Sequence, residues 1–137
     1  MANILIFGAG SMGTAFSFPC SDKKHSVVII GTHLENNFID QINSKKFHPA
    51  IESNIPKNIK FLKFEQLGKE INKKVDLIVV AVSSQGIEWV STELSKVLKY
   101  NIPILILTKG LAINNNNYEI LADRMARLLK KNGIKET

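Results

Sequence analysis

The chain has 137 residues, 45% of them hydrophobic, which is enough for one domain with a sizeable core. Its single cysteine, Cys20, excludes an internal disulfide and is expected to fill space on a helix in a reducing, cytoplasmic setting. No apolar run approaches the length of a membrane span, and no basic segment precedes the short apolar stretch at the N-terminus. Neither a membrane span nor a signal peptide is therefore expected.

The formal net charge of +6 and the isoelectric point near 9.5 suggest nucleic-acid binding at first sight, but the placement of the charges argues against it. The lysines come in pairs near the ends of predicted helices, where cations complement the helix dipole. These pairs are Lys23-Lys24, Lys45-Lys46, Lys73-Lys74 and Lys130-Lys131. They form no single stripe, so we expect no nucleic-acid partner, although a positive surface attracts phosphorylated ligands.

A glycine-rich segment, Gly8-Ala9-Gly10-Ser11-Met12-Gly13, follows the apolar run 4–7 and precedes a predicted helix over residues 12–21. In a strand–turn–helix of this kind, the first glycine permits the tight turn and the second lets the backbone approach a diphosphate. The third lets the helix pack close to the strand. The helix N-terminus adds free N–H groups and partial positive charge. The pattern therefore predicts dinucleotide binding at Gly8, Gly10 and Gly13, with an ordinary glycine-rich turn as the alternative.

Apolar runs and segments of helical period alternate along the rest of the chain. Strands are predicted at 4–7, 26–30, 59–62, 77–82 and 103–107. Helices are predicted at 12–21, from Thr32 onward, at 65–73, after Ser83 or Ser84, and over a last segment that stops at Asn132-Gly133. Pro19 is expected to kink or end the first helix. Residues 48–56 are interpreted as a loop and Asn114–Asn117 as a linker that caps the last helix.

This alternation predicts an α/β fold with a doubly wound parallel sheet of the Rossmann type, five strands in the order 3-2-1-4-5. In such sheets ligands bind beyond the carboxyl ends of the strands, near the point where the strand order reverses. Functional residues are therefore expected directly after residues 7, 30, 82 and 107.

The residues after the second strand are Gly31, Thr32 and His33. A site specific for NAD usually has a carboxylate here for the ribose hydroxyls, and this chain has none until Glu35, one helical turn later. Thr32 and His33 offer hydrogen bonds to a 2′-phosphate, which slightly favours NADP over NAD. The alternatives are helix capping for Thr32 and a solvated first-turn position for His33.

Polar residues also follow the fourth and fifth strands. Ser83 and Ser84 are placed against the nicotinamide half of the cofactor, with helix capping as the alternative. Lys109 follows the fifth strand inside the predicted crevice, where its ammonium can stabilise the oxyanion formed at a carbonyl under hydride attack. The alternative is a lysine that extends into solvent.

Four blocks of the sequence together resemble NAD(P)-dependent glycerol-3-phosphate dehydrogenase. They are the segments 8–15 (GAGSMGTA), 28–31 (VIIG), 80–85 (VAVSSQ) and 107–111 (LTKGL), in the family's order and spacing. The resemblance implies reversible hydride transfer between NAD(P)H and dihydroxyacetone phosphate, giving sn-glycerol 3-phosphate, an entry to phospholipid biosynthesis. It implies cofactor contacts at Ser11, Met12, Thr32 and His33, and a Lys109 that contacts cofactor and substrate and takes part in catalysis.

The sequence departs from the family pattern in several places. Met12 stands where an aromatic residue is usual, and Ser83 where proline is common. The family's second, helical domain, with a further catalytic lysine and most of the substrate phosphate site, is absent from these 137 residues, so pairing with such a half or with a second copy is expected. There are two alternative functions: a non-catalytic NAD(P)-binding module, which stays open, and another reductase, such as one acting on ketopantoate, against which the Thr-Lys-Gly-Leu block with Lys109 argues.

Overall fold

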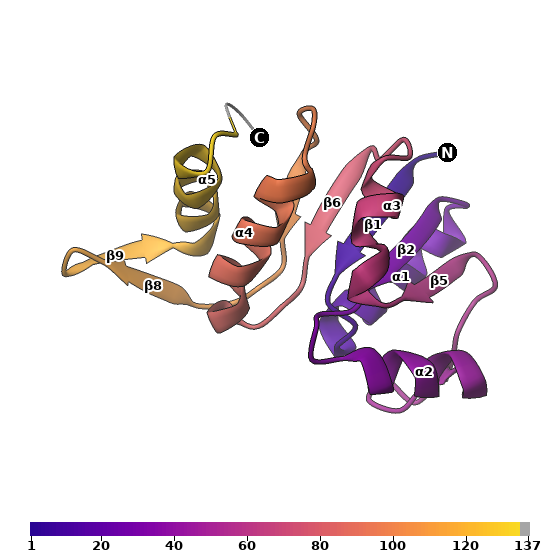
Figure 1. The fold of residues 1–137 in the computed structure, drawn as a ribbon. Coiled ribbons are helices and arrows are strands. Elements are labelled where there is room, and N and C mark those ends of the chain that lie inside the picture. The colour runs from indigo at the N-terminus through magenta and orange to yellow at the C-terminus, as the bar shows by residue number, and fades with distance from the viewer. Residues whose placement is uncertain (135–137) are drawn as a thin grey trace.

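A computed structural model describes residues 1–134 of the chain. A parallel β-sheet lies at the centre of the fold (Figure 1). The sheet contains β1 (Asn3–Phe7), β2 (Ser26–Ile30), β5 (Ile59–Leu62), β6 (Leu77–Val80) and β7 (Ile104–Ile106). Their order is β5-β2-β1-β6-β7, and every neighbouring pair is parallel. This arrangement confirms the predicted doubly wound fold and its strand order.

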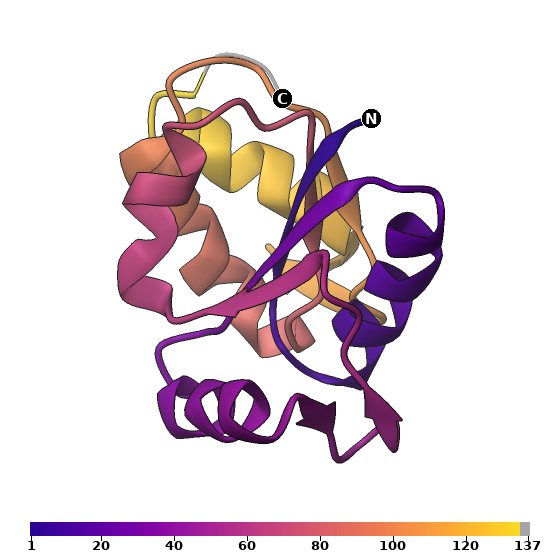
Figure 2. The same cartoon turned by 90° about the vertical axis from the view of Figure 1, so that its right-hand side faces the viewer.

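Helices cover both faces of the sheet, as the view in Figure 2 shows from a second side. The helices are α1 (Ser11–Asp22), α2 (Asn36–Lys45), α3 (Leu67–Ile71), α4 (Ile87–Val97) and α5 (Leu121–Lys131), and short 3-10 turns at Phe64–Gln66 and Ser84–Gly86 lead into α3 and α4. Strand residues alternate between two cores. Leu5, Phe7 and Ile78 face α3, α4 and α5, whereas Ile4, Ile6 and Val79 face α1 and α2.

Two helix predictions need correction. The first helix continues past Pro19 to Asp22, because the proline lies exposed in its last turns, where the carbonyl that loses a partner can bind water. The second helix begins at Asn36 rather than near Thr32, because residues 32–35 form a separate turn in which the Glu35 N–H donates to the Thr32 carbonyl at 3.0 Å.

Two segments predicted to be loop or linker are β-hairpins. Residues 48–56 overlap β3 (Phe47–His48) and β4 (Ser53–Asn54). The polar run Asn114–Asn117 does not cap the last helix but joins β8 (Leu111–Asn114) to β9 (Asn117–Ile120), with Asn115 and Asn116 at φ of 49° and 67°. Consecutive positive φ values are typical of the type I′ turns that close two-residue hairpins, and asparagine tolerates them well. Strands 77–82 and 103–107 are also shorter than predicted, at Leu77–Val80 and Ile104–Ile106.

The sole cysteine lies where the sequence suggested. Cys20 is half-buried on α1 and packs against the core beneath that helix. This burial raises the pKa of the Cys20 thiol above its usual value, which disfavours the thiolate. None of the helices in residues 1–134 is long and apolar enough to cross a membrane.

Candidate functional site

A cleft of about 500 Å³ opens at the carboxyl ends of β1, β2 and β6, the point where the strand order reverses. It brings together several residues that the sequence singled out: Gly8, Gly10, Thr32, His33 and Ser83. Gln85 and Gly86, which the sequence also placed after the fourth strand beside the nicotinamide half, line it as well. The remaining lining residues, Leu34, Glu35, Ala81, Val82 and Trp89, were not placed there by the sequence argument. Three segments distant in sequence thus form one crevice.

The three glycines of the loop have different surroundings. A Cβ on Gly8 would lie 2.6 Å from the Ala81 carbonyl oxygen, and its φ of +108° is one that other residues rarely adopt. A Cβ on Gly13 would lie 2.7 Å from the Gly8 carbonyl oxygen, so this glycine brings α1 against the sheet. A Cβ on Gly10 would meet nothing within 4 Å. Gly10 therefore borders open space in the cleft.

The N-terminus of α1 begins at this loop. Gly10 is its N-cap residue, and no side chain among the described residues caps the helix. Ser11 and Met12 are exposed in the first turn, just outside the cleft lining, so both predicted contacts lie at its rim. Uncapped N–H groups and the helix dipole favour an anion here. The open space over Gly10 and these N–H groups fit the diphosphate of a dinucleotide.

The corner of the cleft beyond β2 differs from expectation because Glu35 reaches it. Its Oε1 accepts the Thr32 N–H at 2.8 Å and the Ala9 N–H at 3.3 Å. The premise that no carboxylate is available here is therefore wrong: the turn at residues 32–35 folds Glu35 back over Gly31. The first of these bonds is one of the two that make up a capping box: the glutamate side chain accepts the N–H of the threonine three residues before it.

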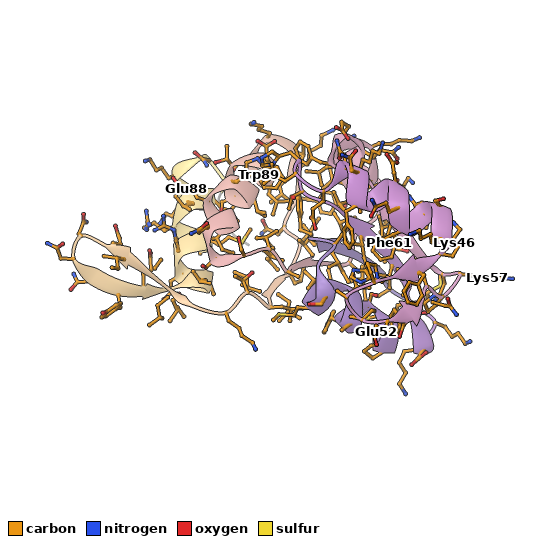
Figure 3. All side chains as sticks on the ribbon, turned by 90° about the horizontal axis from the view of Figure 1, so that it is seen from below. Lys46, Glu52, Lys57, Phe61, Glu88 and Trp89 are labelled. Atoms are coloured by element: carbon orange, nitrogen blue, oxygen red, sulfur yellow. The ribbon has the colours of Figure 1, made fainter. Side chains whose placement is uncertain are left out.

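An aromatic cluster forms the wall opposite the loop. Trp89 of α4, the sole tryptophan, is half-buried, and its ring centroid lies 4.5 Å from that of His33, 5.0 Å from Phe64 and 6.0 Å from Phe7. Figure 3 shows Trp89 on α4 directed toward the side of the molecule that holds Phe61, with its neighbour Glu88 on the other side. The sequence predicted the helix that carries Trp89 but did not predict that this residue lines the cleft. The only indication was that a lone aromatic residue lies close after a strand.

The serines after β6 do not cap the helix that follows. Within the described residues, neither the 3-10 turn at Ser84–Gly86 nor α4 receives a side-chain cap. Ser83 lines the cleft, and both serines are exposed. Ser84 lies beside Gly110, where an added Cβ would meet its side chain at 3.5 Å. The capping alternative for these two hydroxyls is therefore wrong.

Lys109 stands between two anchored neighbours. The Thr108 hydroxyl donates to the Val82 carbonyl at 2.6 Å, and Gly110, at φ of +124°, lies against Ser84. These contacts hold the backbone of Lys109 beside the Ser83–Ser84 wall. Its side chain is exposed and is not part of the cleft lining.

Beneath the glycine loop lies a histidine that the sequence argument did not select. His48 of β3 is fully buried, and its Nε2 lies 2.8 Å from the Ala9 carbonyl oxygen. A carbonyl only accepts, so Nε2 carries the proton. The Phe38 ring packs edge-on against His48 with centroids 5.2 Å apart. Ala9 is thus held on its N–H by Glu35 and on its C=O by His48.

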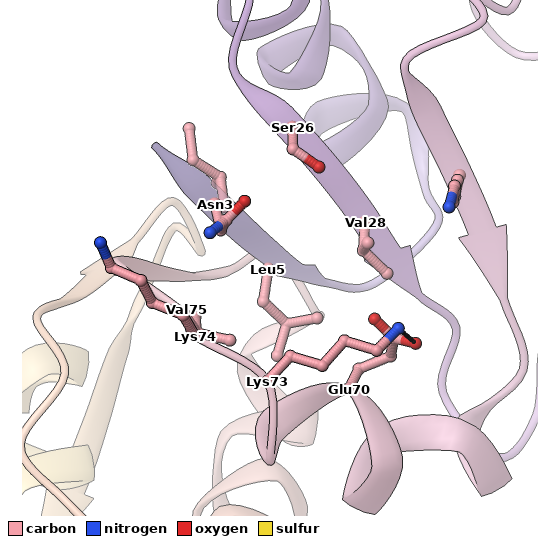
Figure 4. Close-up of a pocket in the computed structure, with 10 residues that line it drawn as sticks. Asn3, Leu5, Ser26, Val28, Glu70, Lys73, Lys74 and Val75 are labelled. Atoms are coloured by element: carbon pink, nitrogen blue, oxygen red, sulfur yellow. Dashed lines mark hydrogen bonds and ion pairs between the residues drawn. The ribbon is translucent and has the colours of Figure 1, made fainter. Parts of the chain in front are cut away.

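A second cavity, of about 250 Å³, lies at the opposite end of the sheet and is shown in Figure 4. It is bounded by the first residues of β1 and β2 and by the segment after α3. Its buried carboxylate, Glu70, is paired with Lys73 at 2.7 Å. Because ligands of parallel sheets bind at the carboxyl ends of strands, this cavity does not compete with the cleft as the functional site.

Comparison with known proteins agrees with this geometry. The family model described as NAD-dependent glycerol-3-phosphate dehydrogenase N-terminus matches residues 3–135. A glycerol-3-phosphate dehydrogenase [NAD(P)+] from an Exiguobacterium species is 30% identical over 92% of this chain and 36% of its own length. An NADP(+)-dependent glycerol-3-phosphate dehydrogenase from Archaeoglobus fulgidus is 27% identical over 91% of this chain and 36% of its own.

The fold of a solved glycerol-3-phosphate dehydrogenase from Coxiella burnetii matches with a TM-score of 0.77, at 24% identity, over 93% of this chain and 38% of that one. The chain thus spans little more than a third of the relatives it matches. With the family model covering nearly its whole length, the chain belongs to the NAD(P)-dependent glycerol-3-phosphate dehydrogenase family, whose N-terminal part it represents.

Proposed function

We propose that this chain is the cofactor-binding half of an oxidoreductase that interconverts sn-glycerol 3-phosphate and dihydroxyacetone phosphate. The observation that carries the proposal is the cleft at the switch point, with open space over Gly10 at an uncapped helix N-terminus. When bound there, the nicotinamide ring of NAD(P) supplies or accepts the hydride. Gly8 and Gly10, with the first-turn residues Ser11 and Met12, hold the diphosphate, and Gly13 keeps α1 close to the sheet behind them.

The residues after β2 and β6 hold the two ends of the cofactor. Thr32 and His33 border the adenosine end, and Ser83 and Ser84 border the nicotinamide end. Lys109, held beside Ser84, is the catalytic residue: its ammonium donates a hydrogen bond to the carbonyl oxygen of the phosphorylated substrate and stabilises the alkoxide as it forms. Its exposed side chain is free to turn toward a substrate that arrives from outside the cleft.

Turnover requires a second half, because this chain supplies only one wall around the reacting atoms. The apolar hairpin face, which we define as Leu111, Ile113, Tyr118 and Ile120, is the surface for that half. These four side chains are 55–80% exposed, and the register of β8 and β9 places all of them on one side. The occupant we assign to this surface is the C-terminal part of the relatives, which makes up close to two thirds of their length and has no counterpart in this chain.

Calorimetry of the 137-residue chain with NADH and with NADPH tests the binding claim. Heat with at least one of them, at a dissociation constant of micromolar to millimolar order, is the expected result. No heat with either, on protein whose circular dichroism shows it to be folded, would reject the function proposed here.

The role of Lys109 requires the second half. Co-expression with the C-terminal part of the Exiguobacterium relative should restore reduction of dihydroxyacetone phosphate, and Lys109→Ala should lower kcat by on the order of a hundredfold or more. Lys99→Ala, an exposed lysine before β7, is the matched control and should leave the rate unchanged. Equal rates for the Lys109 variant and the parent would remove this residue from the mechanism. A pair that assembles and binds NADH but never turns over would favour the alternative of a non-catalytic NAD(P)-binding module, in keeping with the position of Lys109 outside the cleft lining.

A further inference from the structure

The carboxylate of Glu35 occupies the corner of the cleft where the backbone of the glycine loop meets the end of β2. It follows the last residue of β2, Ile30, by five positions, and it arrives there because the turn after Gly31 folds back. Gly31 makes this possible: a Cβ on it would lie 2.9 Å from Ile39 Cγ1 and 3.4 Å from Glu35 Cβ. The backbone position of Glu35 is therefore built into the fold, and the hydrogen bonds from Thr32 and Ala9 hold its side chain.

The hydrogen bonds of Glu35 use only one of its two oxygens. Oε1 accepts both the Thr32 N–H and the Ala9 N–H, whereas Oε2 has no hydrogen-bond partner among residues 1–134. No lysine or arginine in that part of the chain forms an ion pair with this carboxylate, and none lines the cleft. The corner therefore has a fixed negative charge and an oxygen available to accept further hydrogen bonds.

We propose that Glu35 selects NAD over NADP, an inference that rests on the cofactor-binding function proposed above. The free ribose of NAD presents two hydroxyl donors, which a carboxylate accepts through charge-assisted hydrogen bonds. NADP presents a 2′-phosphate, whose negative charge the same carboxylate repels. Phosphate recognition at this point ordinarily needs an arginine, and the described cleft offers no cationic side chain of that kind.

His33 does not replace such an arginine. Its ring centroid lies 4.5 Å from that of Trp89, so the imidazole forms part of the aromatic wall. A 2′-phosphate beside Thr32 would meet the Glu35 carboxylate, which is hydrogen-bonded to the Thr32 N–H, before it met a neutralising group. The sequence alone slightly favoured NADP, because Thr32 and His33 follow β2 and Glu35 was expected one helical turn away. With Glu35 folded back into the cleft, the expected preference is for NAD.

Titrations of the parent chain and of Glu35→Gln with NADH and NADPH test the proposal. Trp89, the sole tryptophan, lies in the cleft wall, so quenching of its fluorescence reports binding without any turnover. The parent should bind NADH about tenfold or more tightly than NADPH. Glutamine keeps an oxygen for the Thr32 N–H but removes the charge, so the variant should bind the two cofactors within about threefold of each other, chiefly by gaining affinity for NADPH.

Asp40→Asn provides the matched control. Asp40 lies exposed on α2, pairs with Lys63 at 3.0 Å and is outside the cleft lining, so its neutralisation should leave the ratio unchanged. A parent that prefers NADPH would overturn the proposal, as would a Glu35→Gln variant that weakens both cofactors equally, since that result assigns Glu35 to loop geometry alone. Both results leave the cofactor-binding function standing. A parent that binds neither nucleotide refutes that function and this inference together.

Discussion

At the scale of single residues, two glycines of the loop are constrained differently by the fold. Gly8 and Gly10 are two positions apart, but a side chain on Gly8 would collide with the Ala81 carbonyl, whereas one on Gly10 would enter open space. The φ of Gly10, −70°, is one that any residue adopts. The first glycine is therefore required by the fold, whereas the fold places no such demand on the second.

Alanine at each position gives opposite results. Gly10→Ala should leave the free energy of unfolding within about 0.5 kcal/mol of the parent while NADH affinity falls by on the order of tenfold or more. Gly8→Ala should lose roughly 3 kcal/mol of stability through its positive φ and the backbone clash. Urea unfolding combined with Trp89 quenching measures both quantities. Unchanged NADH binding by Gly10→Ala would contradict the position assigned to the diphosphate.

At the scale of secondary-structure elements, the β8–β9 hairpin lies beside α5 (Figure 1), and Glu119 of β9 forms ion pairs with two arginines of that helix. Glu119 accepts the Arg127 Nε–H at 2.9 Å and the Nη2–H at 3.1 Å, with Arg124 at 3.7 Å. The hydrogen bond from Arg127 is the main cause that holds the pKa of Glu119 below its usual 4.5. A carboxylate whose pKa is lowered in the folded state stabilises that state once it is ionised.

This contribution has a defined pH dependence. It is fully present above pH 4.5, the ordinary pKa of the group, and disappears as the pH falls through the lower pKa of the folded state. Glu119→Gln should therefore lower the thermal midpoint at pH 7, and the difference from the parent should shrink toward zero below that window. Glu52→Gln, an exposed carboxylate on the other hairpin, serves as the control. A difference that persists unchanged at pH 3 would show that the hairpin is held by other contacts.

The elements also show how far sequence reasoning reaches. The boundaries of β2 and β5 were predicted to the residue. Ser26–Ile30 is a run of Val and Ile with clear ends, and in Ile59–Leu62 the buried residues alternate with an exposed lysine. The hairpins were missed, since two-residue strands have no periodicity and Asn114–Asn117 was interpreted as a cap. The second hairpin could nevertheless have been predicted from this run, because asparagines that tolerate positive φ, between segments of alternating apolar residues, are typical of a hairpin turn.

The functional site was predictable in part for a related reason. Gly8, Gly10, Thr32, His33 and Ser83 line the cleft because each lies within three residues of the end of a strand, and strand ends meet at one edge of a parallel sheet. Glu35 and Trp89 reach the same cleft from inside a turn and a helix. Their arrival depends on how the turn after Gly31 folds back and on which side of α4 faces β1, and local sequence patterns do not specify either.

At the scale of the whole molecule, the surface is uneven. One end of the sheet terminates at β7, which within the described residues pairs only with β6, and Leu105 there is 39% exposed. The apolar hairpin face extends from the same end of the fold, and Figure 1 shows the hairpin projecting from the body of the molecule. Exposed apolar area concentrated in this way is typical of a surface that is covered in the functional protein.

Replacing two of these side chains tests that surface. Ile113→Ser combined with Tyr118→Ser should weaken capture of the co-expressed C-terminal part by on the order of tenfold or more. The thermal midpoint and NADH binding should stay close to those of the parent, because the two side chains are 67% and 80% exposed and lie far from the glycine loop in the chain. Size-exclusion chromatography measures the capture, and calorimetry measures the thermal midpoint and NADH binding. Undiminished capture would assign the apolar hairpin face to another occupant, such as a second copy of the chain.

The double anchorage of Ala9 has a consequence for how this protein tolerates change. Of the three side chains that hydrogen-bond to its peptide groups, Glu35 and His48 come from the single connection between β2 and β5, and the Thr14 hydroxyl of α1 donates a longer bond of 3.4 Å to its carbonyl. Grafting that connection from a relative would therefore alter the geometry of the nucleotide cradle even if every residue of the cradle were kept. We therefore expect a redesign of the cradle to succeed only when the glycine loop and this connection are exchanged together.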